Sequence, residues 1–221
     1  MKTKIFNEKD TAPGWYKKLT PFIKGRNETA LELLDPGNKL LDLGCGYGEL
    51  AILASEKFAN ITGIDIDEER LKRAKNIVKK LGLNNINFQQ IDANRSLPFK
   101  NESFDTVTAL SVIESIENLD LVIEEIHRIL EKNGTFIVDV PNIGYLPERI
   151  KLLFGKLPGV ARAPGWQGGR LHQFTVETLS NYLKKKGFSI KHVSGWGFLK
   201  SIRRVRPSLL LGEIIIAARK K

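Results

Sequence analysis

The sequence predicts an α/β fold in which helices cover a doubly wound, mostly parallel sheet. Apolar runs of strand length alternate with helical patterns through much of the 221-residue chain, and such alternation is typical of a parallel sheet. A glycine-rich turn follows the first apolar run, and an acidic residue ends the second. Together these observations predict a ligand at the carboxyl edge of the sheet, where open α/β sheets bind nucleotides.

Each expected element has its own signal. The helix over 67–81 begins with Asp67 as its N-cap, and its apolar residues recur at helical spacing on one face. A second clear helix, 118–132, is followed by Asn133-Gly134, a pair typical of a helix C-cap. We expect strands at 39–43, 61–65, 86–91, 104–110, 135–140, 188–194 and 213–219, and further helices at 15–34, 49–58 and 175–186.

The glycine turn and two later acidic residues form the candidate cofactor site. Gly44, Gly46 and Gly48 stand where a strand gives way to a helix. There the backbone can approach a ligand closely, and the helix N–H groups face it. Asp65 ends the next expected strand, where a carboxylate can accept hydrogen bonds from both hydroxyls of a ribose. Asp92 would end the third strand and could accept from an adenine amino group. The pattern predicts an adenosine-containing cofactor.

The spacing of the glycines decides between two kinds of cofactor. Dinucleotide sites usually read G-x-G-x-x-G/A, whereas this turn reads G-x-G-x-G, with Asp42 two residues before the first glycine. A carboxylate at that position would repel a pyrophosphate, but it suits a ligand that carries an ammonium and a sulfonium. A NAD-type oxidoreductase is therefore the less favoured alternative.

At these motifs the chain resembles the class I S-adenosylmethionine-dependent methyltransferases. The matching segments are LDLGCGYGEL, GIDID, the IDANRSLPF to SFDTVTAL block and EEIHRILEKNGTFIVDVPN, which span about residues 38–142. The resemblance implies a Rossmann-like seven-stranded sheet of order 3-2-1-4-5-7-6 with an antiparallel seventh strand, and the elements expected after Pro141 fit that ending. It also implies S-adenosylmethionine as the cofactor. We expect this cofactor to be bound by Asp42, Gly44, Cys45, Gly46, Asp65, Ile66, Asp92, Ala93 and Leu110.

Motifs for particular methyl acceptors are missing from the sequence. The [DNS]-P-P-[YFW] tetrad of amino-group methylation on bases does not follow the fourth expected strand, and the paired cysteines of RNA cytosine-C5 enzymes are absent. The quinone O-methyltransferases look similar here, but their metal-binding E-x-x-E-H segment would map to Ser111, Glu114 and Ser115, of which only Glu114 matches. Because a hard divalent cation prefers several oxygen ligands, we expect no bound metal.

His172 is the candidate catalytic residue. It opens the segment His172-Gln173-Phe174-Thr175, which is similar to an H-x-F-[ST] segment in related enzymes that act on small acceptors. Transfer from a sulfonium mainly needs alignment of the reacting atoms and exclusion of water, and it needs a general base only if the acceptor must lose a proton. The alternative is that the His172 ring ties its loop to the helix that follows.

Charge divides the chain into two unlike parts. Up to Asn142 there are 19 Lys and Arg against 22 Asp and Glu, a net −3, and from Ile143 onward there are 16 against 3, a net +13. Such asymmetry favours an anionic substrate, a nucleic acid or a membrane surface, unless the charges are simply solvated. We expect a methyltransferase that methylates an oxygen atom of a small or lipid-like acceptor. One version of this interpretation has an anionic acceptor. An RNA methyltransferase is the second interpretation, although no recognised RNA-binding module is present.

We expect one domain over 1–221 with added segments. Residues 1–37 would form an N-terminal helical cap, and 143–173 and 195–211 would form the acceptor side or a lid. The longest apolar stretch is too short to span a bilayer, and the single cysteine, Cys45, cannot form an internal disulfide. We interpret Cys45 as a small side chain that fills the turn and take a cytoplasmic location as the default, with peripheral membrane contact as an option. The oligomeric state stays open.

Overall fold

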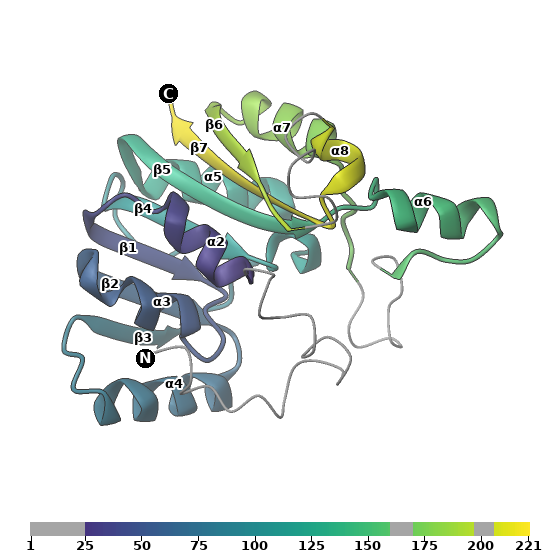
Figure 1. Ribbon diagram of the computed structural model, residues 1–221. Helices are drawn as coiled ribbons and strands as arrows, with labels where there is room; N and C mark the ends of the chain where they lie inside the picture. The colour runs from purple at the N-terminus through teal and green to yellow at the C-terminus, as the bar shows by residue number, and fades with distance from the viewer. Residues whose placement is uncertain (1–24, 160–169, 197–205) are drawn as a thin grey trace.

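In the computed structural model, helices pack on both faces of one seven-stranded sheet (Figure 1). The structure describes residues 25–159, 170–196 and 206–221. The strand order is β3-β2-β1-β4-β5-β7-β6. Strand β7 pairs antiparallel with both β5 and β6, and the other neighbouring strands pair in parallel. The predicted fold class, strand order and antiparallel seventh strand are therefore confirmed.

The elements match the sequence prediction closely. The strands are β1 (Gly37–Leu43), β2 (Phe58–Asp65), β3 (Ile86–Gln90), β4 (Phe104–Leu110), β5 (Leu130–Pro141), β6 (Phe188–Ser194) and β7 (Glu213–Lys220). The helices are α2 (Arg26–Leu33), α3 (Glu49–Leu53), α4 (Glu68–Lys80), α5 (Leu119–Ile129), α6 (Leu146–Leu153), α7 (Val176–Lys185) and α8 (Pro207–Leu210), with the short 3-10 turns η3 (Ala54–Glu56) and η4 (Ile113–Ser115). The predicted strands at 104–110 and 188–194 are confirmed to the residue.

The helix predicted over 49–58 is shorter than expected. Helix α3 ends at Leu53, η3 follows, and β2 already begins at Phe58, which pairs with Gly37 of β1. Phe58 is buried in the core. Burial and strand pairing outweigh the helical pattern at this end, because local propensity is a weak preference that tertiary packing overrides.

The helix predicted over 118–132 also ends early, at Ile129, and the predicted C-cap at Asn133-Gly134 is wrong. Both residues lie inside β5, beside a shift in its register with β4. Asn133 has a φ of 61° there, a left-handed conformation that asparagine tolerates better than most residues. The dipeptide that usually signals a helix end marks an irregularity in a strand instead.

Two apolar clusters bury the sheet from opposite sides. Leu41 and Leu43 belong to the cluster that includes α5 and α7, whereas Leu40 belongs to the cluster that includes α2, α3 and α4. Side chains of a strand alternate between faces, so a run that is buried on both faces reads as continuously apolar. With both faces covered, the carboxyl edge of the parallel strands is left for a ligand.

The added segments are described only in part. Of the helix predicted over 15–34, the described part is α2, which begins only at Arg26 because Gly25 is extended and stands as its N-cap; residues 15–24 lie outside the described residues. Helix α6 forms within 143–173, a segment for which we expected an acceptor side or lid and named no helix. In the part of the chain that the structure describes, no helix is both long and apolar enough to cross a membrane. The roles of cap and lid stay predictions.

Candidate functional site

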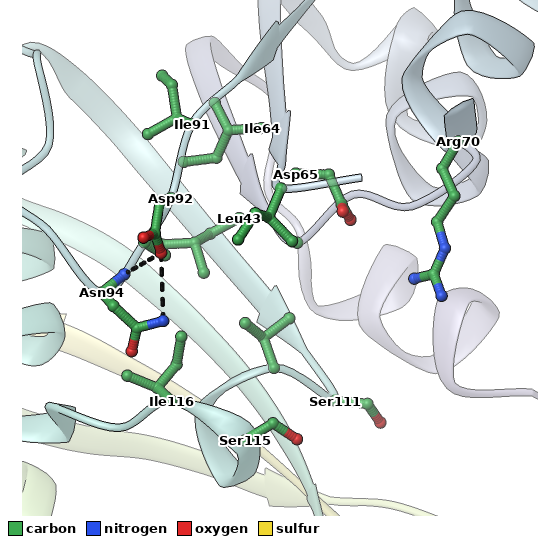
Figure 2. Close-up of a pocket in the computed structure, with 14 residues that line it drawn as sticks. Leu43, Ile64, Asp65, Arg70, Ile91, Asp92, Asn94, Ser111, Ser115 and Ile116 are labelled. Atoms are coloured by element: carbon green, nitrogen blue, oxygen red, sulfur yellow. Dashed lines mark hydrogen bonds between the residues drawn. The ribbon is translucent and has the colours of Figure 1, made fainter. Parts of the chain in front are cut away.

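A cavity of about 320 Å³ lies at the carboxyl edge of the sheet, beyond the ends of β1, β2 and β3 and beside the loop that follows β4 (Figure 2). The strand order reverses between β1 and β4, and ligands of open α/β sheets bind at such a switch point. Of the nine residues predicted to bind the cofactor, the cavity is lined by Gly44, Asp65, Ile66, Asp92 and Ala93.

The glycine turn leaves room at one position and none at another. The backbone N–H groups of Gly44 and Cys45 donate to the carbonyl of Ile64 at 2.7 and 2.9 Å, which fixes the turn against β2. A Cβ atom at Gly44 would run into the side chain of Val112, whereas one at Gly46 would meet nothing within 4 Å. A ligand can therefore lie directly against the backbone at Gly46.

The carboxylate of Asp65 is held in place by the backbone. The N–H of Gly46 donates to Asp65 Oδ2 and the N–H of Asp67 donates to Asp65 Oδ1, each at 2.9 Å. Asp65 is largely buried, yet it lines the cavity. Each carboxylate oxygen can accept more than one hydrogen bond. Asp65 can therefore receive two neighbouring hydroxyl groups without any rearrangement, as a bound ribose requires.

The loop after β3 forms the far wall of the cavity. Asp92 Oδ1 accepts from the backbone N–H of Asn94 at 2.9 Å and from its side-chain amide at 3.2 Å, the two dashed contacts in Figure 2. Ile66, which is 63% exposed, also lines this part of the cavity, together with Ala93. A planar base could pack against the exposed apolar side chain of Ile66 and donate a hydrogen bond to the carboxylate of Asp92. These residues fit the adenosine of S-adenosylmethionine.

Asp42 does not line the cavity. It is almost fully buried and accepts from the hydroxyl of Thr108 at 2.8 Å. Burial raises the pKa of Asp42 to about 7, and repulsion from Asp65 adds to this rise while the Thr108 hydrogen bond opposes it. Asp42 precedes Gly44 by two residues, and its predicted interaction with the cofactor ammonium stays a prediction.

Cys45, Gly46 and Leu110 also lie outside the set of residues that line the cavity. Burial, followed by the nearby carboxylates of Asp42 and Asp65, raises the pKa of the Cys45 thiol. The thiol therefore stays protonated and is a poor nucleophile. Leu110 is the last residue of β4 and pairs with Asp139 of β5. Their predicted contacts with the cofactor also stay predictions.

A second polar group lies beside the first residue after β4. The hydroxyl of Ser111, which lines the cavity, donates to Asp139 Oδ2 at 3.0 Å and accepts from Arg26 Nη1 of α2. Ser111 has a φ of 54°, a left-handed conformation that is costly for a non-glycine residue and is often retained at functional sites. We call Arg26, Ser111 and Asp139 the serine relay.

Asp139 is completely buried, and among the described residues its Oδ1 has no hydrogen-bond partner. Burial raises its pKa well above the ordinary value, and Glu213 and Glu114 add to this rise while Arg26 and the Ser111 hydrogen bond lower it. A buried carboxyl group with a raised pKa holds a proton more tightly than an ordinary carboxyl group and is suited to proton transfer.

Glu114 is a second buried carboxyl group on this side. Its Oε2 also has no partner among the described residues, while Oε1 lies 3.8 Å from Arg170 Nε. Burial raises its pKa. In the described part of the chain, no group of three or more His, Cys, Asp and Glu side chains is placed to hold a metal ion.

His172 lies behind the cavity wall. Its Nε2 is 2.8 Å from the carbonyl of Ile116, and its backbone N–H donates to the carbonyl of Glu114 at 3.0 Å. Ile116 lines the cavity, whereas His172 does not. This geometry agrees with a ring that ties two loops together, and a catalytic role for His172 stays a prediction.

Sequence reasoning missed part of the site. Arg26, Ser111 and Asp139 lie far apart in the chain, and only the fold brings them together. The available signal for Ser111 was its place directly after a predicted strand, where site residues gather. Asn94 was missed although it follows the predicted Asp92 closely, and its amide bond to Asp92 depends on a loop conformation that spacing does not reveal.

Comparisons with known proteins agree with this geometry. A family model described as a methyltransferase domain matches residues 34–187. The chain is 34% identical over 114 residues to phosphatidylethanolamine N-methyltransferase of Cereibacter sphaeroides, covering 51% of this chain and 55% of that protein. It is also 34% identical over 144 residues to 24-methylenesterol C-methyltransferase 2 of Arabidopsis thaliana, covering 56% and 38%. The matched region thus spans about half or less of each relative.

The fold is shared with solved structures. An S-adenosylmethionine-dependent methyltransferase from Mesorhizobium loti superposes with a TM-score of 0.66 at 21% identity, covering 89% of this chain and 99% of that chain. At this level of identity the likeness concerns the fold. It extends over the strands that form the carboxyl edge and its cavity.

Proposed function

Because the chain belongs to the methyltransferase-domain family and is an S-adenosylmethionine-dependent methyltransferase, we propose that it methylates a small or lipid-like acceptor. The cavity carries this proposal, because its lining extends from Asp65 on the cofactor side to Ser111 and Ser115 on the other side. The relatives named for phosphatidylethanolamine and for a sterol support a lipid-like acceptor. Family membership also decides against the NAD-type oxidoreductase.

S-adenosylmethionine supplies a methyl group that its sulfonium already activates. Asp65 would hold the ribose, Asp92 and Asn94 would meet the adenine edge, and the open backbone at Gly46 would lie beside the cofactor. Fixed hydrogen-bond acceptors of this kind lower the cost of aligning the reacting atoms, because the protein has already lost its freedom there. The acceptor must then be positioned and, where it carries a proton, deprotonated.

The serine relay would receive the acceptor. Ser111 lines the cavity, and its hydroxyl donates to the buried carboxyl group of Asp139. A hydroxyl acceptor must lose its proton, and Ser111 Oγ could take up that proton while it passes its own to Asp139 Oδ2, the oxygen to which it already donates. We therefore propose oxygen as the methylated atom. We also propose that the acceptor is anionic in one version, because the positive charge of Arg26 lies beside Ser111, to which Arg26 donates a hydrogen bond. His172 could contribute indirectly, because its Nε2 contacts the carbonyl of Ile116, a residue that lines the cavity.

Two measurements test the proposal. Calorimetry should show binding of S-adenosylhomocysteine, the cofactor product, and no comparable binding of NADH. Radiolabelled S-adenosylmethionine should then transfer its methyl group to small phenols or dispersed lipids. Binding of NADH alone would overturn the proposed cofactor.

The RNA alternative rests on the net +13 of residues 143–221. An RNA acceptor should become labelled in the same assay, and its binding should weaken steeply as salt is added, because phosphate contacts release counterions. Label on RNA with this salt dependence would replace the lipid-like acceptor. Label on a small or lipid-like acceptor, with little effect of salt, would support our proposal.

A further inference from the structure

Helix α6 carries an apolar surface that the rest of the described structure does not cover. The helix projects away from the sheet, beyond the end of β5 (Figure 1). Leu153 is 82% exposed and Phe154 is 73% exposed. Ile150, Leu152 and Leu157 are also largely exposed. We call these five residues the α6 tip. Large apolar side chains gathered in this way usually mark an interaction surface.

The α6 tip is held in shape by its own hydrogen bonds. Glu148, which is buried, accepts from Lys151 Nζ at 2.6 Å and from the backbone N–H of Gly159 at 2.5 Å. The N–H of Lys156 donates to the carbonyl of Lys151 at 2.8 Å, and Gly155 turns the chain with a φ of 67°. Glu148 thus fastens the returning chain to the helix. The apolar side chains are presented by a folded turn.

The polar residues around the tip are basic. Arg149 and Lys156 are exposed, and Lys151 is half-buried beside Glu148. Glu148 is the only acidic residue between 143 and 159, and its carboxylate is already engaged by Lys151 and Gly159. The tip therefore offers apolar side chains and positive charge together, with no exposed carboxylate in that segment.

We propose that the α6 tip docks this protein on an anionic lipid bilayer. Leucine and phenylalanine side chains enter the boundary between headgroups and acyl chains, while basic residues beside them are attracted to anionic lipids. Charge complementarity favours the bilayer over a protein partner, because the exposed polar residues beside the tip include Arg149 and Lys156 and no exposed carboxylate, and an anionic lipid surface supplies the opposite charge.

The position of α6 gives the docking a consequence for the site. Helix α6 follows β5 at the carboxyl edge of the sheet, the same edge at which the cavity opens. A molecule docked through α6 would hold this edge near the bilayer. This inference does not depend on the proposed function, because the tip could dock the protein even if the acceptor were soluble.

Vesicle co-sedimentation of the full chain tests the proposal. We expect binding to phosphatidylglycerol-containing vesicles and much weaker binding to phosphatidylcholine alone. The double variant Leu153→Ser with Phe154→Ser should weaken binding at least tenfold, and Lys156→Glu should weaken it about fivefold. The matched controls are Leu171→Ser, an exposed leucine outside the tip, and Lys80→Glu, an exposed lysine on α4. Both controls should bind like the unchanged protein, apart from a small general charge effect.

Circular dichroism and S-adenosylhomocysteine binding show whether each variant is folded, and highly exposed side chains can be replaced without loss of core packing. Equal vesicle binding by the double variant and the unchanged protein would overturn the proposal. So would an absence of vesicle binding, or sedimentation velocity showing that the tip joins two copies of the chain. If the unchanged protein failed to bind the cofactor product, the proposed function would be contradicted, but the vesicle-binding result would still decide whether the α6 tip docks on lipid.

Discussion

The carboxyl groups on the cofactor side and on the acceptor side of the cavity differ in their hydrogen bonding. At the cofactor end, both oxygens of Asp65 accept hydrogen bonds from backbone N–H groups. At the acceptor end, Asp139 and Glu114 each keep one buried oxygen without a partner among the described residues. Buried polar groups are normally paired, and Asp105 Oδ1 at the amino end of β4 is also without a partner among the described residues, so it is the hydrogen bond from the cavity-lining Ser111 that singles out Asp139. The cofactor side thus has its carboxylate fixed by the backbone for a constant ligand, whereas the acceptor side reaches its buried carboxyl group only through Ser111.

Gly46→Val should abolish binding at the cofactor end. A branched side chain would fill the space beside Gly46, which is open for at least 4 Å around an added Cβ, and calorimetry should detect no binding of S-adenosylhomocysteine. Gly82→Val is a matched control, because Gly82 also has a positive φ, of 66°, and open space around it. Both variants carry the same backbone strain, so normal binding by Gly46→Val would remove the assigned cofactor position.

Asp42→Asn should change how stability depends on pH. Burial raises the pKa of Asp42 from its ordinary value of 3.8 to about 7 in the folded protein. The folded state therefore binds the proton more tightly, and stability should fall as pH rises between these values. The loss should reach up to about 4 kcal/mol above pH 7, since each pKa unit corresponds to about 1.4 kcal/mol.

Asparagine keeps an oxygen for Thr108 but does not titrate. Urea unfolding at several pH values should therefore show a shallower fall for Asp42→Asn than for the unchanged protein. Parallel curves for the two proteins would mean that Asp42 does not hold its proton in the folded state.

Asp139→Asn should slow turnover roughly a hundredfold, because general base catalysis typically contributes at least that much. Asp139 must be ionised to accept a proton, so activity of the unchanged protein should rise as pH rises through its raised pKa. Burial chiefly raises that pKa; Glu213 and Glu114 add to the rise, and Arg26 and the Ser111 hydrogen bond oppose it. The variant should lose this rise in its pH–rate profile while binding S-adenosylhomocysteine normally.

The matched control for that substitution is Asp105→Asn. Asp105 lies at the amino end of β4, where its carboxylate accepts from the N–H groups of Asn38 and Lys39. Its replacement should affect stability and leave the shape of the pH–rate profile unchanged. If Asp139→Asn kept the profile of the unchanged protein, the serine relay would not carry the proton.

The cofactor end could be predicted because its geometry follows from local sequence. Gly44, Asp65 and Asp92 each stand at the end of an expected strand, and parallel strands bring their carboxyl ends to one edge. The acceptor end could not be predicted in the same way. Its Arg26 comes from α2 and its Asp139 from β5, and the φ of Ser111 is a product of packing rather than of a motif.

The misplaced helix end at Asn133-Gly134 has the same physical origin. A dipeptide that tolerates a left-handed conformation can end a helix or occupy an irregular strand, and the pairing of β5 with β4 decides between them. The sequence also makes Arg203 and Arg204 candidates to meet an anionic acceptor group or an acidic membrane surface, and this prediction falls outside the described residues.

The most direct test of the cofactor site is the affinity of Asp65→Ala for S-adenosylhomocysteine, measured by calorimetry beside Asp105→Ala. Both aspartates accept two backbone N–H groups, but only Asp65 lines the cavity. Loss of a charged hydrogen-bond acceptor costs about 1.5–3 kcal/mol per bond. Asp65→Ala should therefore bind at least tenfold more weakly, while a folded Asp105→Ala keeps its affinity. An unchanged dissociation constant for Asp65→Ala would contradict the assignment of the ribose to Asp65.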